Sequence, residues 1–424
     1  MDKSGEFPKN FIQQTIPETL KFIGGGGLPR VGVGIRFEAN LFAPDTDLSD
    51  NQPDEILGTK TVATDIVAQI GNGVFIVEIE ETINLPDGQI FAKGFQLQPE
   101  QVLIPIVGGT DSFKNIRGFQ QITPVQIPIL FNSTLEKSEE IKGTRGDDDI
   151  KGKNASEFIA GNNGNDTLKG RGGNDIIEGG RGGDIIRGGA GNDVLAADRI
   201  DRFQDFDGSH SELRGGNGDD IIYGGSKDDI IGGGNDNDIL LGKDGDDLIR
   251  GGSGFDLLNG GIGNDTLRGQ AGIDIADYYD LTFNGVFGTV AGVDVNLDKN
   301  QAKHSSNNNA LTWTDTLTTI ENVQGTTRND RFIGDENNNV FYGREEVGRD
   351  DRKTEFIGLD GKSYKVTGDV VEYDGNQSEF TFGVSSKESF EDGLTVSGSG
   401  IGEDILFGIE FIKFDDGLVA TDSI

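Results

Sequence analysis

The chain of 424 residues contains no cysteine, two histidines, one methionine and one tryptophan. The absence of cysteine excludes disulfide bonds, thiol chemistry and cysteine-based zinc sites. The two histidines, His210 and His304, lie in polar stretches with no second histidine at ligand spacing, and neither H-E-x-x-H nor G-x-S-x-G occurs. The sequence therefore gives no support to a zinc protease or a serine hydrolase.

Long apolar runs are also missing. No stretch reaches the roughly 18 apolar residues that a membrane-spanning helix needs, and the first 20 residues lack the apolar segment of an N-terminal signal peptide. Basic residues are scarce as well, with 37 Lys and Arg against 73 Asp and Glu and a formal net charge of −36. This charge disfavours nucleic acid and anionic membranes as partners.

Glycine is abundant, and much of it lies in a nine-residue repeat that runs in frame from Gly143 to Asp277. Clear copies read GGAGNDVLA (188–196), GGNGDDIIY (215–223) and GGSGFDLLN (251–259). Position eight is aliphatic almost throughout. Position six is aspartate in most units, and a thirteenth such aspartate follows in GTTRNDRFI; these residues are Asp148, Asp166, Asp175, Asp184, Asp193, Asp220, Asp229, Asp238, Asp247, Asp256, Asp265, Asp274 and Asp330.

Each repeat divides into a turn and a very short strand. The first six residues are turn-forming, because glycine permits positive φ and close backbone approach. The last three have strand character but cannot close a core alone, so successive units must stack their position-eight side chains on one another. Two repeats then form one coil with a strand on each side. The sequence predicts a parallel β-roll with two inner ladders of Ile and Leu.

Stacking also aligns the position-six carboxylates along the turns, where like charges repel. Ca²⁺ removes this conflict, because it accepts several carboxylate and carbonyl oxygens at once. The pattern therefore predicts multiple Ca²⁺ ions and folding coupled to metal binding. Two alternatives remain open: a disordered Gly/Asp-rich tract, and a β-helix that needs no calcium.

The repeat matches the glycine- and aspartate-rich nonapeptide of the repeats-in-toxin (RTX) family, also called the hemolysin-type calcium-binding repeat. The resemblance covers residues 143–277 and 325–343, and it implies calcium held between successive turns. It also implies a secreted, extracellular protein that leaves the cell by type I secretion, through export machinery that reads an uncleaved C-terminal signal. The last residues, LVATDSI, resemble the end of such a signal.

Some units depart from the pattern, so we expect their edges to hold no ion. GKNASEFIA (152–160) has Glu157 at position six, and GGSKDDIIG (224–232) has Lys227 in place of a turn glycine. Residues 197–214 lose the motif but have the length of two repeats, with Leu213 still at position eight. We expect these 18 residues to form one full coil in register, with an irregular outer loop.

The N-terminal third has a different pattern. Residues 1–23 are polar with scattered apolar residues, which predicts a flexible arm, and residues 134–142 are predicted to be a linker. Between them, residues 24–133 alternate polar and apolar residues at period two, as at Phe75, Val77 and Ile79. This stretch predicts an antiparallel β-barrel or sandwich.

Within that stretch, IVGGTDSFKNIRGF (106–119) resembles the GGTGxFxxARGY signature of dirigent proteins and the allene-oxide-cyclase barrel group. The matching residues are Gly108, Gly109, Thr110, Phe113, Arg117 and Gly118, whereas Asp111, Ile116 and Phe119 depart from the signature. The resemblance implies an eight-stranded barrel with an apolar cavity. Candidate catalytic residues are Asp45, Asp47 and Arg117, but the favoured interpretation is structural: Asp45 and Asp47 as solvated loop residues and Arg117 as an ion-pair partner.

Residues 278–424 are predicted to form a β-rich cap and export region that includes the short second repeat patch at 325–343. The whole chain is therefore all-β: an N-terminal antiparallel β-barrel, a central parallel β-roll of stacked nonapeptide repeats, and the C-terminal cap. Ile409, Phe411, Ile412 and Phe414 are expected to cover the open end of the roll.

The sequence favours a secreted calcium-binding protein whose barrel binds a small apolar molecule or surface glycan, or acts as a scaffold. One alternative is a cyclase, isomerase or dirigent-type barrel acting on a lipid-derived or phenolic intermediate. Another is an extracellular structural or coat protein. An enzymatic role is the less favoured interpretation, and no cofactor other than calcium is expected.

Overall fold

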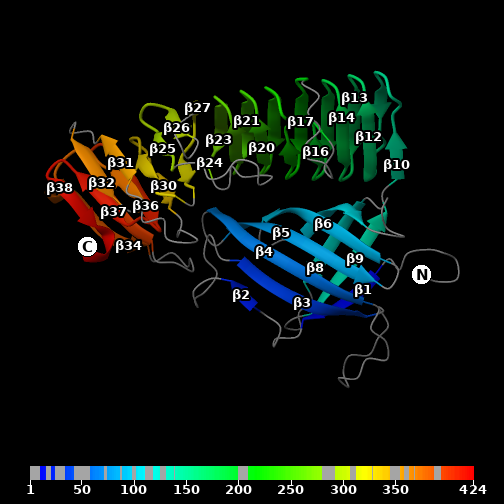
Figure 1. Cartoon of the computed structure of the whole chain (residues 1–424), viewed down its shortest axis with the longest axis horizontal. Coiled ribbons are helices and arrows are strands. Elements are labelled where there is room, and N and C mark those ends of the chain that lie inside the picture. The colour runs from blue at the N-terminus through cyan, green and yellow to red at the C-terminus, as the bar shows by residue number, and fades with distance from the viewer. Residues whose placement is uncertain are drawn as a thin grey trace. The chain divides into compact units, whose positions relative to one another are not determined.

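The computed structural model is built almost entirely of strands (Figure 1). It describes residues 139–198, 209–278, 292–305, 312–326, 328–343, 354–357, 362–366, 368–385 and 393–424, together with the backbone of nine strands between residues 10 and 137. The chain divides into two compact units, residues 1–141 with 156–158, and residues 142–155 with 159–424. The predicted all-β fold is confirmed.

The first unit contains one antiparallel sheet in the order β1-β9-β8-β7-β6-β5-β4-β3-β2. Because β1 pairs with both β9 and β3, eight of these strands form a closed ring, which is the predicted barrel. The strands are β1 (Asn10–Thr15), β2 (Lys21–Ile23), β3 (Gly34–Phe42), β4 (Gly58–Ile70), β5 (Val74–Leu85), β6 (Gly88–Leu97), β7 (Val102–Gly109), β8 (Gly118–Pro124) and β9 (Leu130–Lys137).

Strands extend into two segments that we expected to be irregular. Strands β1 and β2 lie within the predicted arm, and β9 and β10 (Glu139–Lys142) take up most of the predicted linker. Closure of the ring explains β1, because its insertion between β9 and β3 pairs two edges that would otherwise stay open. Asp45, Asp47 and Arg117 lie outside the described residues.

The second unit contains the roll, in which the two strands of each coil belong to two different parallel sheets (Figure 1). Sheet I has the order β10-β12-β14-β16-β18-β20-β22-β24-β28-β30-β36-β35-β34. After β10, its strands are β12 (Glu157–Asn163), β14 (Ile176–Arg181), β16 (Val194–Ala196), β18 (Ile221–Tyr223), β20 (Ile239–Asp244), β22 (Leu257–Ile262), β24 (Ile275–Asp277), β28 (Asn322–Gln324), β30 (Val340–Tyr342), β36 (Glu403–Phe407), β35 (Gly393–Gly398) and β34 (Phe380–Ser385).

Sheet II has the order β11-β13-β15-β17-β19-β21-β23-β27-β26-β25-β29-β33-β37-β38. Its strands are β11 (Asp149–Lys151), β13 (Thr167–Gly172), β15 (Ile185–Ala190), β17 (Glu212–Asn217), β19 (Ile230–Asn235), β21 (Leu248–Gly254), β23 (Thr266–Gly272), β27 (Thr312–Thr318), β26 (Gln301–Ser305), β25 (Asp294–Asn296), β29 (Arg331–Ile333), β33 (Val370–Glu372), β37 (Phe411–Phe414) and β38 (Gly417–Ala420). A hairpin of β31 (Thr354–Ile357) and β32 (Ser363–Val366) and two 3-10 turns, η3 (Gln377–Glu379) and η4 (Thr421–Ser423), complete the described elements.

The aliphatic residues at position eight form the core between the two sheets, as predicted. In sheet I, Ile222 pairs with Leu240 and Leu240 with Leu258, and all three side chains are fully buried. Sheet II stacks its position-eight residues in the same way, and Leu168 pairs with Ile186. In these three pairings, each step from one strand to its neighbour advances the chain by 18 residues.

The prediction that residues 197–214 form one full coil in register was wrong, although Leu213 does lie at position eight. Among the described residues of this segment, strand β17 begins at Glu212, and Ile186 pairs with Leu213 at an offset of 27 residues rather than 18. Sheet I shows the same offset, because Leu195 pairs with Ile222. One repeat length is therefore inserted between neighbouring strands of each sheet. Each repeat after the insertion lies in the opposite sheet from the one that a strict 18-residue alternation would give it.

The second repeat patch continues both sheets of the roll. Phe332 of β29 and Phe341 of β30 are fully buried at position eight and stack on each other, with ring centroids 5.4 Å apart. In the last coil, Ile412 and Phe414 are fully buried, whereas Phe411 is only half-buried. Antiparallel strands β34 and β38 form the final edges of the two sheets. Within the described part of the chain, no helix has the length and apolar character needed to cross a membrane.

Candidate metal centre

The turn of each repeat has a backbone conformation that favours glycine at positions two and four. Gly180 and Gly182 occupy these positions in one unit, with φ values of 107° and 127°. Where the sequence lacks glycine, other residues adopt the same left-handed conformation: Asn162, Arg171, Asp236, Lys243 and Gln270. The turn therefore keeps a positive φ at these positions even where the residue is not glycine and this conformation is unfavourable.

Position one requires glycine for a different reason. A Cβ atom added at Gly161 would lie 2.2 Å from Asp166 Oδ2 and 2.7 Å from the carbonyl oxygen of Gly179 in the next coil. At Gly242 the same atom would lie 2.3 Å from Asp247 Oδ2 and 2.4 Å from the Gly260 carbonyl oxygen. The missing side chain thus leaves a small space that a carboxylate oxygen and a backbone carbonyl oxygen both face.

The position-six aspartates form two ladders through their Oδ1 atoms. Asp220 N–H donates to Asp238 Oδ1 at 2.9 Å, and Asp238 N–H donates to Asp256 Oδ1 at 2.9 Å. Sheet II carries the ladder Asp148, Asp166, Asp184, Ser211, Asp229, Asp247, Asp265 and Asp315. Sheet I carries the ladder Asp175, Asp193, Asp220, Asp238, Asp256, Asp274 and Glu321.

Position five forms a second ladder that the sequence analysis missed. Asn237 N–H donates to Asp219 Oδ1 at 2.9 Å, and Phe255 N–H donates to Asn237 Oδ1 at 2.9 Å. These bonds run opposite to those of position six, so each turn is held to the coils before and after it. The recurrence of Asn or Asp at position five was the available signal.

The second oxygen of many position-six aspartates has no hydrogen-bond partner although it is buried. This holds for Oδ2 of Asp166, Asp193, Asp220, Asp238, Asp247, Asp256, Asp265 and Asp274. Each of these side chains is at most 2% exposed. A buried carboxylate oxygen without a donor is costly, so these atoms need a cation or a proton.

Burial raises the pKa of these carboxyl groups, and the neighbouring carboxylates raise it further. The pKa reaches about 9 for Asp238 and for Asp247, and about 8 for Asp220. Desolvation is the largest cause in each case. In the absence of metal, protons would therefore occupy part of the array near neutral pH.

Three of the thirteen predicted ligands differ from the aspartates described above, because a backbone N–H of their own unit donates a hydrogen bond to their Oδ2. Asp148 accepts from Thr144 N–H at 2.6 Å, and Asp330 accepts from Thr326 N–H at 2.7 Å. Asp229 accepts from Gly225 N–H at 2.6 Å, and its pKa rises only to about 6. This geometry fits the expectation that the unit containing Lys227 holds no ion.

In the closing coils, other side chains of the protein donate hydrogen bonds to the second carboxylate oxygen. Asp315 Oδ2 accepts from the Tyr278 hydroxyl at 3.0 Å and lies 3.2 Å from Nε2 of the buried His304. In the last coil, Asp404 Oδ2 accepts from the Tyr373 hydroxyl at 3.0 Å. Burial raises the pKa of Asp404 to about 6, less than for Asp238, and the tyrosine donor opposes the rise.

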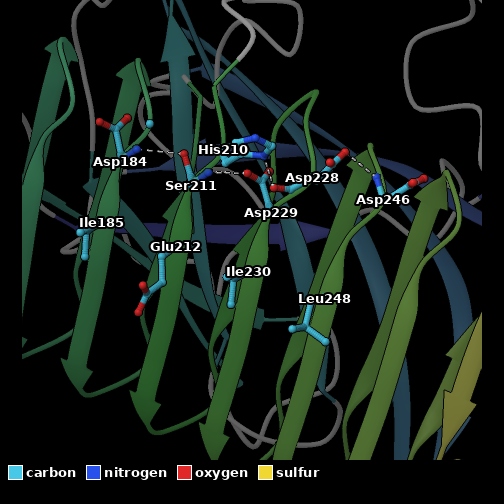
Figure 2. A pocket seen from close by; sticks show the side chains of 11 residues that line it. Asp184, Ile185, His210, Ser211, Glu212, Asp228, Asp229, Ile230, Asp246 and Leu248 are labelled. Atoms are coloured by element: carbon cyan, nitrogen blue, oxygen red, sulfur yellow. Dashed lines mark hydrogen bonds between the residues drawn. The ribbon is translucent and has the colours of Figure 1, made fainter.

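The sheet II ladder changes chemistry next to the inserted repeat (Figure 2). Ser211 replaces aspartate there, accepting from Asp184 N–H through Oγ at 3.1 Å and donating its own N–H to Asp229 Oδ1 at 2.7 Å. His210 lies beside it, with Nδ1 2.8 Å from the Asp228 carbonyl oxygen. An open cavity of about 390 Å³ lies at this edge, with Ile230 among its lining residues.

The residues of the regular turns fit a calcium ion. No cluster of three or more acidic or histidine side chains converges within the described ranges. An ion would therefore be held by Oδ2 of a position-six aspartate together with backbone carbonyl oxygens of the adjacent turn, such as Gly179 O beside Asp166. Mixed carboxylate and carbonyl oxygens are the donors that Ca²⁺ prefers.

We predict that Asp238→Asn raises the free calcium concentration at the folding midpoint by about tenfold, because one ligand charge is lost. The matched substitution Asp229→Asn should shift the midpoint far less, since Gly225 N–H already occupies its Oδ2. Calcium titrations followed by circular dichroism measure both midpoints. Equal shifts in the two variants would contradict this assignment of the sites.

We also predict that the fold of the metal-free protein becomes less stable as the pH rises. The folded pKa of Asp238 and Asp247 lies far above the usual value near 3.8, so the folded roll binds more protons than the unfolded chain. The protons stabilise the fold below about pH 4, and this contribution is lost as the pH rises through about 9. Circular dichroism of resin-stripped protein should show more β-structure at pH 5 than at pH 9, and a more stable fold at pH 9 would contradict this prediction.

Solved structures give only weak likenesses. A pyocyanin demethylase is 19% identical, and the match covers 30% of this chain and 98% of that chain with a TM-score of 0.24. An exo-specific intermolecular Diels–Alderase is 17% identical over 30% of this chain and 90% of its own, and a Diels–Alderase from Streptomyces koyangensis is 13% identical over 30% and 62%, both with TM-scores of 0.24. Such low scores carry no conclusion about this chain. No curated protein matches it.

A family profile described as the RTX calcium-binding nonapeptide repeat matches residues 136–168, 160–195, 212–240, 241–276 and 317–345. These ranges include the turns whose buried carboxylate oxygens lack donors, and the last range contains the second repeat patch. The profile matches the repeat unit that the geometry shows, and repeats of this kind bind calcium. The chain therefore carries an array of RTX calcium-binding nonapeptide repeats.

Proposed function

We propose that this protein is secreted and that its β-roll folds when it binds Ca²⁺ outside the cell. The observation that supports this proposal is the row of buried Oδ2 atoms without donors at position six. A row of neighbouring carboxylates at low exposure destabilises a folded chain unless cations neutralise it. Calcium binding therefore supplies free energy that the metal-free roll lacks.

The proposed ligands are the aspartates whose Oδ2 has no donor, and they lie between Asp166 and Asp274 on both ladders. Bound calcium would supply positive charge at each turn edge. The chain's own residues orient the carboxylates, because backbone N–H groups fix each Oδ1 and the position-one glycines keep the space beside Oδ2 open. In the first unit and in the one containing Lys227, backbone N–H groups already bind the Oδ2 atom, so these units would not need an ion.

Export before folding agrees with these properties. A chain that cannot neutralise its roll at low calcium would stay unfolded inside the cell and fold where calcium is millimolar. The absence of cysteine means that no disulfide has to form on the way. By this proposal, the export machinery recognises the C-terminal region and the protein works outside the cell.

A calcium titration of the full-length protein tests the proposal. We expect stripped protein at pH 8 to gain β-sheet signal cooperatively as calcium rises, and Mg²⁺ to substitute poorly because it demands a smaller, octahedral site. Circular dichroism measures the signal. A spectrum that does not change between chelator and millimolar calcium would overturn the coupling of folding to calcium.

For the N-terminal barrel we propose binding of a small apolar molecule. The supporting observation is the closed ring of eight strands, a size whose interior can hold one small ligand. Fatty-acid-derived or phenolic compounds should then raise the melting temperature of the calcium-loaded full-length protein, because a ligand that binds the native state stabilises it. No shift with either chemical class would favour a scaffold or protein-binding role.

A further inference from the structure

A column of basic residues runs along the outer face of sheet II. It consists of the position-nine residues Lys151, Lys169, Arg187, Arg214, Arg250 and Arg268, with Gly232 between Arg214 and Arg250. Each residue is the direct neighbour of the next one across adjacent parallel strands. At roughly 4.8 Å per strand, this basic column extends for about 30 Å.

The basic column faces outward. Position eight points into the core, where Leu168, Ile186 and Leu213 are fully buried, so position nine points to the opposite side of the sheet. The arginine side chains at positions 187 and 214 are 44% and 60% exposed. The corresponding residues of sheet I from β12 to β24 include no cation: Ala160, Glu178, Ala196, Tyr223, Leu241, Asn259 and Asp277.

The inserted repeat keeps all six cations on one sheet. In a strict 18-residue alternation, position 187 would be followed in its sheet by 205, and Arg214, Arg250 and Arg268 would belong to the other sheet. The 27-residue step instead pairs Arg187 with Arg214. The insertion thus joins two short groups of cations into one continuous column.

The chain only partly neutralises the basic column. Lys151 Nζ lies 2.9 Å from Asp149, and Glu212 lies 2.8 Å from Arg214 and 3.9 Å from Arg187. Within the described part of the chain, no ion pair engages Lys169, Arg250 or Arg268. Like charges on adjacent strands destabilise a sheet, so an external anion bound along the column would relieve the repulsion among its cations.

We propose that the basic column binds an extended, carboxylate-bearing polysaccharide that lies along the axis of the roll. An extended polymer can meet a cation on each strand, whereas the phosphates of a nucleic-acid duplex wind away from a straight column. Arginine supplies four of the six cations, and its planar group binds carboxylates through two hydrogen bonds. Beside the column, the exposed Ile185 and Ile230 could contact the C–H face of sugar rings.

The column exists only when the strands are stacked, so binding rests on the calcium-dependent folding proposed above. Fluorescence anisotropy with labelled oligoglucuronate, too short to gel with calcium, measures binding to the full-length protein at saturating calcium. We expect saturable binding that weakens with added salt. Circular dichroism of the same samples separates the two proposals: an unfolded roll would contradict the proposed function, and a folded roll without binding would overturn this inference.

The variant Arg250→Gln/Arg268→Gln removes two cations of the column and should weaken binding about tenfold. The control Arg145→Gln/Lys227→Gln removes the same charge from exposed residues outside the column and should bind like the original chain. Equal weakening in both double variants would reduce the effect to net charge and overturn the assignment. Competition by single-stranded DNA at equal or lower concentration would overturn the choice of polysaccharide.

Discussion

The structure depends on how a stack of buried carboxylates can be made stable. Each regular turn places an aspartate where one oxygen accepts a backbone N–H from the neighbouring coil and the other faces a space with no donor. The first bond fixes the carboxylate, and the second oxygen then needs a cation or a proton. The position-one glycine keeps that space open, because any side chain would collide with the carboxylate and the next carbonyl. Glycine and aspartate are therefore parts of one constraint, which a bound cation would satisfy.

The same constraint explains where the array does not need an ion. Thr144, Gly225 and Thr326 direct their N–H groups at the second carboxylate oxygen of their own units. The closing coils use the Tyr278 and Tyr373 hydroxyls instead. Donors from the chain thus lie in the first unit, in the unit that contains Lys227 and in the closing coils. The turns whose buried Oδ2 atoms have no donor lie between the first unit and the closing coils.

Sequence periodicity predicted the roll, its inner ladders and the turn aspartates, because these depend on spacing within a repeat. It did not predict the 27-residue step across residues 197–214, because the length of a segment does not decide which strands pair across it. Pairing between distant residues decided the outcome, as Leu195 with Ile222 shows. The closure of the barrel through β1 was missed for the same reason. The donors for Asp229 and Asp404 depended on turn conformation and on a distant tyrosine, which spacing does not encode.

The inserted repeat links the calcium chemistry to the outer surface. It places Ser211 in a ladder of aspartates, and the same register shift places Arg214 next to Arg187. One irregular segment therefore changes both the edge and the face of the roll. Both placements, of Ser211 and of Arg214, exist only when the coils stack in the observed register.

Anomalous X-ray diffraction from crystals grown in calcium would locate the ions in the roll. We expect density peaks beside Oδ2 of Asp193, Asp220, Asp238 and Asp247, and none beside Oδ2 of Asp148 or Asp229, where N–H groups already bind. A calcium-grown crystal with no peak beside Asp238, or with equal peaks at Asp229 and Asp238, would contradict this expectation.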